Sequence, residues 1–299
     1  FFNFIAKPFR SILVYYYIGM SDTKEKQMKG LKRNTIDKFY TKSQIAHECI
    51  QHIQNTITFA YDDCIIEPSA GNGAFIEGIN RLSKNVLLYD IEPQAENIIK
   101  QDYLQLDVSE LTNTENTYHA IGNPPFGRQS SLAIKFIKQS SLFCESISFI
   151  LPKSFKKESM QRHFPLSFHL IFEVDLANNA FTVDDIEHHV PCIFQIWKKK
   201  EMLRDAIPRL QPTLYTFVKK HENPDISVRR VGVNAGEISK DYTSKSVQTH
   251  YFLKFSEGVI TDDIFKQLEN VNFISRDNTV GPRSISKQEL NLEYMKLLH

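Results

Sequence analysis

The chain has 299 residues, which exceeds one ordinary catalytic domain, so a catalytic domain with a smaller appended region is expected. Its formal net charge of +1 excludes a strong overall attraction to a polyanion. Basic residues gather instead at 24–38 and 153–162, where each run predicts either a solvated face or phosphate contacts.

The first twenty residues are rich in aromatic side chains. Lys7, Pro8 and Arg10 interrupt the apolar run, which is too short to span a bilayer. No cleavage site of a signal peptide is clear. Met20 precedes a polar, Lys-rich stretch, so we expect it to be the natural start and residues 1–37 to form an N-terminal extension. An interfacial anchor is the alternative.

Four scattered cysteines lie in apolar contexts, at Cys49, Cys64, Cys144 and Cys192. The sequence contains no Cys-x-x-Cys pair and no Cys/His spacing of a zinc site. It therefore predicts reduced core thiols, an intracellular setting and no bound metal.

The first strand with ligand-type residues is expected at 64–66. It leads into Glu67-Pro68-Ser69-Ala70-Gly71-Asn72-Gly73-Ala74-Phe75 and then a helix-like stretch. A strand, a Gly-x-Gly turn and a helix form the nucleotide-binding arrangement of open α/β sheets. The turn lacks the third glycine of a dinucleotide fingerprint, so we do not expect a pyrophosphate site.

Two further strand ends carry acids. The run at 85–89 ends in Asp90, which could accept hydrogen bonds from ribose hydroxyls, beside Ile91, which could cover an adenine face. The run at 98–103 contains Asp102, which could accept a hydrogen bond from an adenine amino group. Ordinary strand ends are the alternative interpretation.

A fourth strand end carries Asn123-Pro124-Pro125-Phe126. Consecutive prolines hold φ near about −65° and keep Asn123 out of the helical region, so the turn is stiff. The Asn123 side-chain oxygen and the Pro124 carbonyl could accept the two hydrogens of a nucleobase amine, while Phe126 stacks on the base. A simple Asn-Pro turn between a strand and a helix is the alternative.

Taken in order, Pro-x-x-Gly-x-Gly, Asp-Ile-x-Pro, Asp-Tyr and Asn-Pro-Pro-Phe resemble the class I S-adenosylmethionine-dependent methyltransferases, specifically those that modify adenine N6. The resemblance covers residues 38–200. It implies an α/β, Rossmann-like class I methyltransferase fold with a mostly parallel sheet, and S-adenosyl-L-methionine as cofactor. A smaller C-terminal α+β region is expected from residue 201.

The resemblance also assigns roles to residues. Cofactor contacts are implied at Glu67, Pro68, Ala70, Gly71, Gly73, Phe75, Asp90, Ile91, Asp102 and Tyr103. The implied catalytic turn consists of Asn123, Pro124, Pro125 and Phe126.

Three less specific candidates complete the predicted site. In the segment Phe39 to Ala46, Tyr40 and Thr41 would border the methionine moiety, although Lys42 stands where a proline is usual. The same segment reads as a helix start with Thr41 or Ser43 as N-cap. Phe181 would pack against the target base, with a core position as the alternative, and Lys153 would contact substrate near the rim.

Residues 201–299 interleave basic and aromatic side chains around short strand-like runs at 214–219, 226–233 and 251–255. Because this region follows the catalytic turn, it is expected to recognise the target, as in adenine enzymes that place recognition last. DNA is the favoured partner, RNA is the alternative, and no membrane partner is expected. Phe126 in place of tyrosine argues against a protein glutamine substrate. An inactive nucleic-acid-binding subunit is disfavoured because competent residues occupy every motif.

Overall fold

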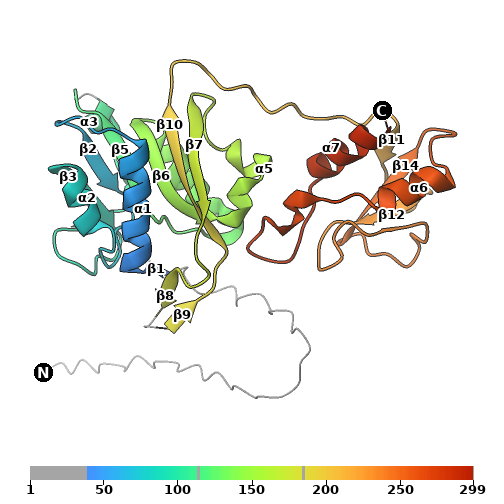
Figure 1. Ribbon diagram of the computed structural model, residues 1–299, viewed down its shortest axis with the longest axis horizontal. Helices are drawn as coiled ribbons and strands as arrows, with labels where there is room; N and C mark the ends of the chain where they lie inside the picture. The colour runs from blue at the N-terminus through green and yellow to red at the C-terminus, as the bar shows by residue number, and fades with distance from the viewer. Residues whose placement is uncertain (1–38, 113–114, 184–185, 299) are drawn as a thin grey trace, which may run out of the picture. The chain divides into compact units, whose positions relative to one another are not determined.

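The structure is a computed structural model that describes residues 39–112, 115–183 and 186–298, and these form three β-sheets (Figure 1). The predicted extension at 1–37, with its suggested start at Met20, lies outside the described residues.

The largest sheet has the strand order β4-β3-β2-β5-β6-β10-β7. Its strands are β2 (Cys64–Glu67), β3 (Asn85–Asp90), β4 (Ile99–Lys100), β5 (Tyr118–Gly122), β6 (Cys144–Pro152), β7 (Phe168–Asp175) and β10 (Cys192–Lys199). The strands from β4 to β6 pair in parallel, whereas β10 is antiparallel to both β6 and β7. The predicted Rossmann-like, mostly parallel sheet is confirmed.

The direction of strand addition reverses at β2. The chain passes from β2 to β3 and β4 on one side, and then returns to place β5 on the other side of β2. In open α/β sheets such a reversal leaves a crevice beyond the carboxyl ends of the strands, where ligands bind. The predicted motifs follow the carboxyl ends of the four strands around this reversal.

Helix α1 (Ser43–Thr56) precedes β2, the first strand of this sheet. Four shorter helices lie between its strands: α2 (Ile76–Leu82), α3 (Ser109–Thr112), α4 (Ser131–Ser140) and α5 (Glu158–Gln161). Helix α1 buries one stripe that includes Ile45, Cys49 and Ile53, as expected of an amphipathic helix. The prediction of Thr41 or Ser43 as N-cap was wrong, because Lys42 occupies that position and makes no side-chain capping bond.

A second, three-stranded sheet contains β1 (Tyr40–Thr41), β8 (Phe181–Val183) and β9 (Ile186–His188). Strand β1 is antiparallel to β8, with Thr41 opposite Phe181. The Lys42 backbone N–H also donates to the Ala180 carbonyl oxygen at 3.0 Å. This pairing holds the segment before α1 against a loop about 140 residues away in sequence.

The C-terminal region forms an antiparallel sheet with the order β11-β14-β12-β13. It comprises β11 (Tyr215–Phe217), β12 (Ile226–Arg229), β13 (Ile238–Ser239), β14 (His250–Phe255), α6 (Asp262–Glu269) and α7 (Lys287–Leu298). Ile226, Val228 and Leu253 share a buried apolar cluster with Leu268 of α6 and Leu290 of α7. The predicted smaller α+β region is confirmed.

All four cysteines are buried and free. None of the helices in the described ranges is long and apolar enough to cross a membrane.

The contact between α1 and α2 leaves no room for a side chain at Gly78. A Cβ there would lie 2.5 Å from Ile50 Cγ1. Alanine gains about 1 kcal/mol over glycine in a helix, but overpacking costs about 1–3 kcal/mol. We therefore expect Gly78→Ala to lower the free energy of unfolding by about 1 kcal/mol, as measured by urea denaturation. Gly281→Ala is the control, because no atom lies within 4 Å of its added Cβ; equal effects would contradict the packing argument.

Candidate active site

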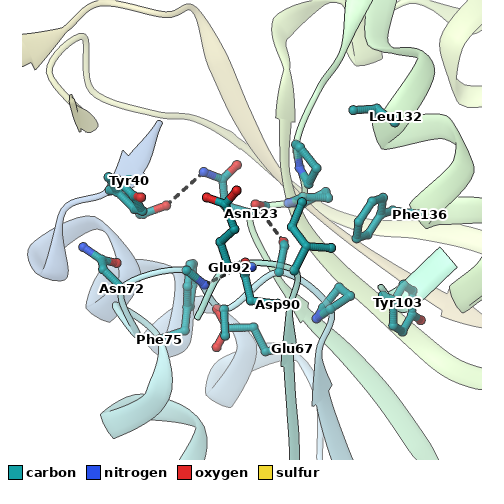
Figure 2. A pocket seen from close by; sticks show the side chains of 18 of the residues that line it. Tyr40, Glu67, Asn72, Phe75, Asp90, Glu92, Tyr103, Asn123, Leu132 and Phe136 are labelled. Carbon is teal, nitrogen blue, oxygen red and sulfur yellow. Dashed lines mark hydrogen bonds between the residues drawn. The ribbon is translucent and has the colours of Figure 1, made fainter. Parts of the chain in front are cut away.

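A cavity of about 290 Å³ lies beyond the carboxyl ends of β2 to β5. Figure 2 shows Glu67, Asp90 and Asn123 gathered there, with Tyr40 and Phe136 on its walls. The predicted site residues that line the cavity are Tyr40, Thr41, Glu67, Pro68, Ala70, Gly71, Phe75, Asp90, Ile91, Asp102, Tyr103, Asn123, Pro124, Pro125 and Phe126. Residues from four strand ends and from β1 therefore meet in one place.

The Asn123 side chain is held in a single orientation. Its amide nitrogen donates to the Phe39 carbonyl oxygen at 3.3 Å and to Thr41 Oγ1 at 3.1 Å. Because a carbonyl can only accept a hydrogen bond, the contact with Phe39 fixes which end of the amide is the nitrogen. The Asn123 backbone carbonyl is also held, by the Ser69 hydroxyl at 3.0 Å.

This orientation leaves the Asn123 side-chain oxygen as an acceptor. The oxygen is buried and has no hydrogen-bond partner among the described residues. A buried acceptor without a partner costs about 1–3 kcal/mol, so its retention calls for an explanation. Since Asn123 lines the cavity, a ligand that donates an N–H to this oxygen would explain why the unpaired acceptor is retained.

Asp90 organises the glycine turn and keeps acceptor capacity. Its Oδ2 accepts from the Gly71 backbone N–H and its Oδ1 from the Glu92 backbone N–H, both at 2.8 Å. A carboxylate has about four lone-pair sites, so two remain for ligand hydroxyls. Gly71 has φ of +51°, and a Cβ there would lie 3.4 Å from the Tyr40 ring. The turn thus needs glycine for its conformation and approaches Tyr40 closely.

Glu67 is an unusual carboxyl group. It is 1 % exposed, and its Oε2 has no hydrogen-bond partner in the part of the chain that the structure describes. Burial, followed by the nearby Asp90 carboxylate, raises the pKa of Glu67 to about 8. The side chain is therefore mostly protonated at neutral pH, and a cation entering the cavity would favour its ionised form.

The cavity wall beyond Asp90 combines apolar and acidic side chains. Ile91 lines the cavity although its side chain is 58 % exposed, which suits a position that a flat ligand would cover. Asp102 lies two residues beyond β4, where its Oδ1 accepts from the Leu104 backbone N–H at 2.9 Å. Its other carboxylate oxygen accepts no hydrogen bond from the residues that the structure describes. Tyr103 is buried, and its hydroxyl lies 2.8 Å from Ser140 Oγ. Because its polar group is paired with Ser140, Tyr103 forms part of the cavity wall.

Three predicted site residues do not line this cavity. A Cβ on Gly73, whose φ is +82°, would lie 2.8 Å from Ile76 Cδ1, so this glycine serves the turn itself. Phe181 is fully buried, and its ring packs edge-on against Phe39 with centroids 6.2 Å apart. Lys153 lies 3.6 Å from Asp175 in an ion pair.

Several residues that line the cavity were not predicted from the sequence: Phe39, Ser69, Asn72, Ala74, Glu92, Gln101, Leu104, Leu132 and Phe136. Ser69, Asn72 and Glu92 lie inside predicted motifs, so proximity to those motifs could have identified them. Leu132 and Phe136 lie on α4 and carry no sequence signal beyond helical spacing. The described residues contain no group of His, Cys, Asp and Glu that could hold a metal ion.

Backbone conformation is unusual directly after the turn formed by Asn123 to Phe126. Gly127, Gln129 and Ser130 have φ of +67°, +54° and +62°. Non-glycine residues in this region are strained, and such strain concentrates at functional sites. The Phe126 carbonyl oxygen accepts from the Leu132 N–H at 3.0 Å, which ties the turn directly to the start of α4.

Comparisons with solved structures find methyltransferases at low similarity. No known family model and no curated protein matches it. An rRNA methylase from Streptococcus thermophilus has 15% identity over 52% of this chain and 94% of that chain, with a TM-score of 0.35. The N-methyltransferase NodS from Bradyrhizobium japonicum has 11% identity over 53% and 98%, with a TM-score of 0.37. The 23S rRNA methyltransferase ErmE has 12% identity over 55% and 70%, with a TM-score of 0.38. At such values, functional assignment rests on the site itself.

Glu67 should make stability depend on pH. Its raised pKa means that the folded state retains a proton that the unfolded chain loses, so stability falls from about pH 4.5 to about pH 8 and then levels off. Glu67→Gln should remove this loss of stability. At pH 8 the free energy of unfolding of the variant should exceed that of the wild type by a few kcal/mol, since one pKa unit is about 1.4 kcal/mol. Chemical denaturation between pH 5 and 9 measures this difference.

Glu77→Gln is the matched control for this experiment, because Glu77 is an exposed helical glutamate in an (i, i+4) pair with Arg81. Its stability profile should run parallel to that of the wild type. A parallel profile for Glu67→Gln as well would show that Glu67 does not hold the proton.

Proposed function

We propose that the chain is an S-adenosylmethionine-dependent methyltransferase that acts on the N6 amine of adenine in nucleic acid, with DNA favoured over RNA. The observation that carries this proposal is the buried Asn123 side-chain oxygen, which is fixed as an acceptor at a cavity wall and has no partner among the residues that the structure describes.

The cofactor part of the proposal is supported by the fit between the cavity and the chemistry of S-adenosylmethionine. Spare acceptor positions on Asp90 suit ribose hydroxyls, and the exposed Ile91 suits an adenine face. Glu67 is a buried carboxyl group whose ionisation a positively charged ligand would favour. When bound, the cofactor supplies an electrophilic methyl group.

The catalytic part rests on hydrogen-bond geometry. The lone pair of an adenine amine is delocalised into the ring, so the amine is a poor nucleophile. Accepting its hydrogens at the Asn123 side-chain oxygen and the Pro124 carbonyl would localise that lone pair and aim it at the methyl group. Orientation of this kind is worth about 7–11 kcal/mol for a well-aligned pair, and no covalent enzyme intermediate is needed.

Phe126 is the proposed platform for the target base. Its ring is 9 % exposed and belongs to the core cluster, so a base would meet an aromatic side chain already fixed by packing. Base–aromatic stacking is worth about 1–3 kcal/mol. That gain would offset much of the cost of removing an adenine from a duplex, which is about a few kcal/mol. Phe181 is proposed to act only indirectly, through Phe39.

Residues 201–299 are proposed to recognise the target nucleic acid. Support comes from their position after the catalytic turn and from basic side chains stacked on aromatic ones. Lys287 Nζ lies 4.3 Å from the Phe217 ring centroid, and the Arg230 guanidinium lies 5.4 Å from that of Tyr251. Basic side chains can contact backbone phosphates and aromatic side chains can stack on bases, so both kinds of group are suited to binding nucleic acid.

The direct test incubates the protein with labelled S-adenosylmethionine and either DNA or RNA, and then identifies the nucleosides by mass spectrometry. Label in N6-methyladenine from DNA is expected. Label from RNA alone would replace the DNA preference with the RNA alternative. Cofactor binding without transfer to either polymer would favour an inactive binding subunit.

Asn123→Ala should reduce methyl transfer roughly 100-fold or more, because the amine loses its acceptor and its alignment. Asn123→Asp should be nearly as harmful, since a carboxylate oxygen would then face the Phe39 carbonyl oxygen. Both variants should bind the cofactor within a few-fold of the wild type by calorimetry. Asn270→Ala, on an exposed helix end, is the control. Near-normal turnover by Asn123→Ala would leave the turn with a structural role only.

A further inference from the structure

A second cavity, of about 260 Å³, lies on the C-terminal sheet. Side chains alternate between the two faces of a strand, and Ile226 and Val228 of β12 belong to the apolar cluster under α6 and α7. Ser227 and Arg229 therefore face the other way, and both line this cavity. His250 of β14 is directly opposite Arg229 and lines it too.

The lining is dominated by cationic and hydroxyl groups. Arg229 and Lys245 are partly buried, and neither makes an ion pair with an acidic side chain among the described residues. Elsewhere in this region Lys240 pairs with Asp262 at 2.7 Å and Arg283 with Asp277 at 2.6 Å. The hydroxyl-bearing residues around the cavity are Ser227, Ser239, Ser244, Ser246 and Thr249.

Arg229 and Lys245 both lie close enough to His250 to affect its pKa. Burial lowers the pKa of His250, and the charges of Arg229 and Lys245 lower it further. The Ser246 backbone carbonyl and the Glu237 carboxylate act in the opposite direction. Glu237 is the one acidic residue in the described lining of this cavity, against the basic residues Arg229 and Lys245. A bound anion stabilises positive charges that are partly buried.

We propose that this cavity binds a phosphate group through Arg229, Lys245 and the Ser246 hydroxyl. Arginine and lysine are the usual phosphate ligands. The Ser246 hydroxyl accepts from the Gln248 backbone N–H at 3.2 Å and donates to no described residue, so its hydrogen can serve an anion. This proposal rests on the proposed function: if the target is a nucleic acid, the bound phosphate group belongs to its backbone. The cavity would then anchor the target at a place separate from the catalytic turn. A free phosphate or a nucleotide offers the same chemistry.

The test compares Arg229→Gln and Lys245→Gln with the wild type. Binding of a fluorescent DNA duplex is measured by anisotropy as a function of salt concentration. Each variant should reduce the slope of log affinity against log salt by about 1, the value for one lost phosphate contact. The controls Arg283→Gln and Lys240→Gln remove exposed cations that already pair with aspartates and should leave the slope unchanged.

A second arm titrates inorganic phosphate into the same proteins by calorimetry. A heat signal that disappears in Arg229→Gln and Lys245→Gln, with unchanged DNA slopes, supports the phosphate site but assigns it to a free phosphate. Unchanged slopes together with unchanged or absent phosphate binding overturn the proposal. Thermal unfolding checks that each variant is folded. If Arg229→Gln does not fold, Lys245→Gln alone provides the test.

The two proposals can fail separately. A wild-type protein that binds no DNA or RNA would remove the nucleic-acid substrate, whereas the phosphate titration would still decide whether the cavity is an anion site. Normal cofactor binding is expected in every variant of this series, because none of the substituted residues lines the cavity at the strand ends.

Discussion

The hydrogen bond from the Asn123 amide nitrogen to the Phe39 carbonyl oxygen is the interaction on which the site depends. It determines which end of the amide remains as an acceptor, and it ties the turn after β5 to the segment that begins at β1. That segment is in turn held by β8, through the pairing of Thr41 with Phe181. The orientation of the Asn123 amide, and with it the acceptor that faces the cavity, therefore depends on the turn after β5, on β1 and on β8, which are far apart in sequence.

This dependence explains the difference between the predicted and observed roles of Phe181. The sequence shows an aromatic residue before a strand, and the family resemblance places an aromatic residue there beside the target base. In the structure the ring packs behind Phe39 and supports the strand that orients Asn123. A pairing between residues about 140 positions apart leaves no local trace in composition or periodicity, so the sequence alone could not distinguish these roles.

Where a motif coincides with a strand end, prediction from sequence was effective. Glu67, Asp90 and Asn123 were each predicted from an apolar run followed by a turn, and parallel pairing brings them to one edge. Strand β7, the β8–β9 hairpin and helices α6 and α7 were not predicted. Strand β7 lies at the edge of the sheet, and most of its residues are only partly buried, so its apolar pattern is weak.

Charge runs were the least informative sequence feature. Lys153, Lys156 and Lys157 read as a basic rim, yet they pair with Asp175, Glu173 and Glu289. The carboxylates that neutralise them come from other segments, which a count of local charge cannot reveal. Cations at Arg229 and Lys245 are less conspicuous in the sequence and remain without acidic partners in the described structure.

The two apolar clusters share no residue: one runs from Ile45 to Trp197 and the other from Tyr215 to Tyr294. Separate cores often unfold as separate cooperative units. A small molecule held only in the crevice at the strand ends would then stabilise the first unit by mass action and leave the second untouched. In a calorimetric scan, the temperature of the C-terminal transition would then serve as an internal reference. The occupancy of the crevice could be judged from how far the other transition shifts relative to it in the same sample.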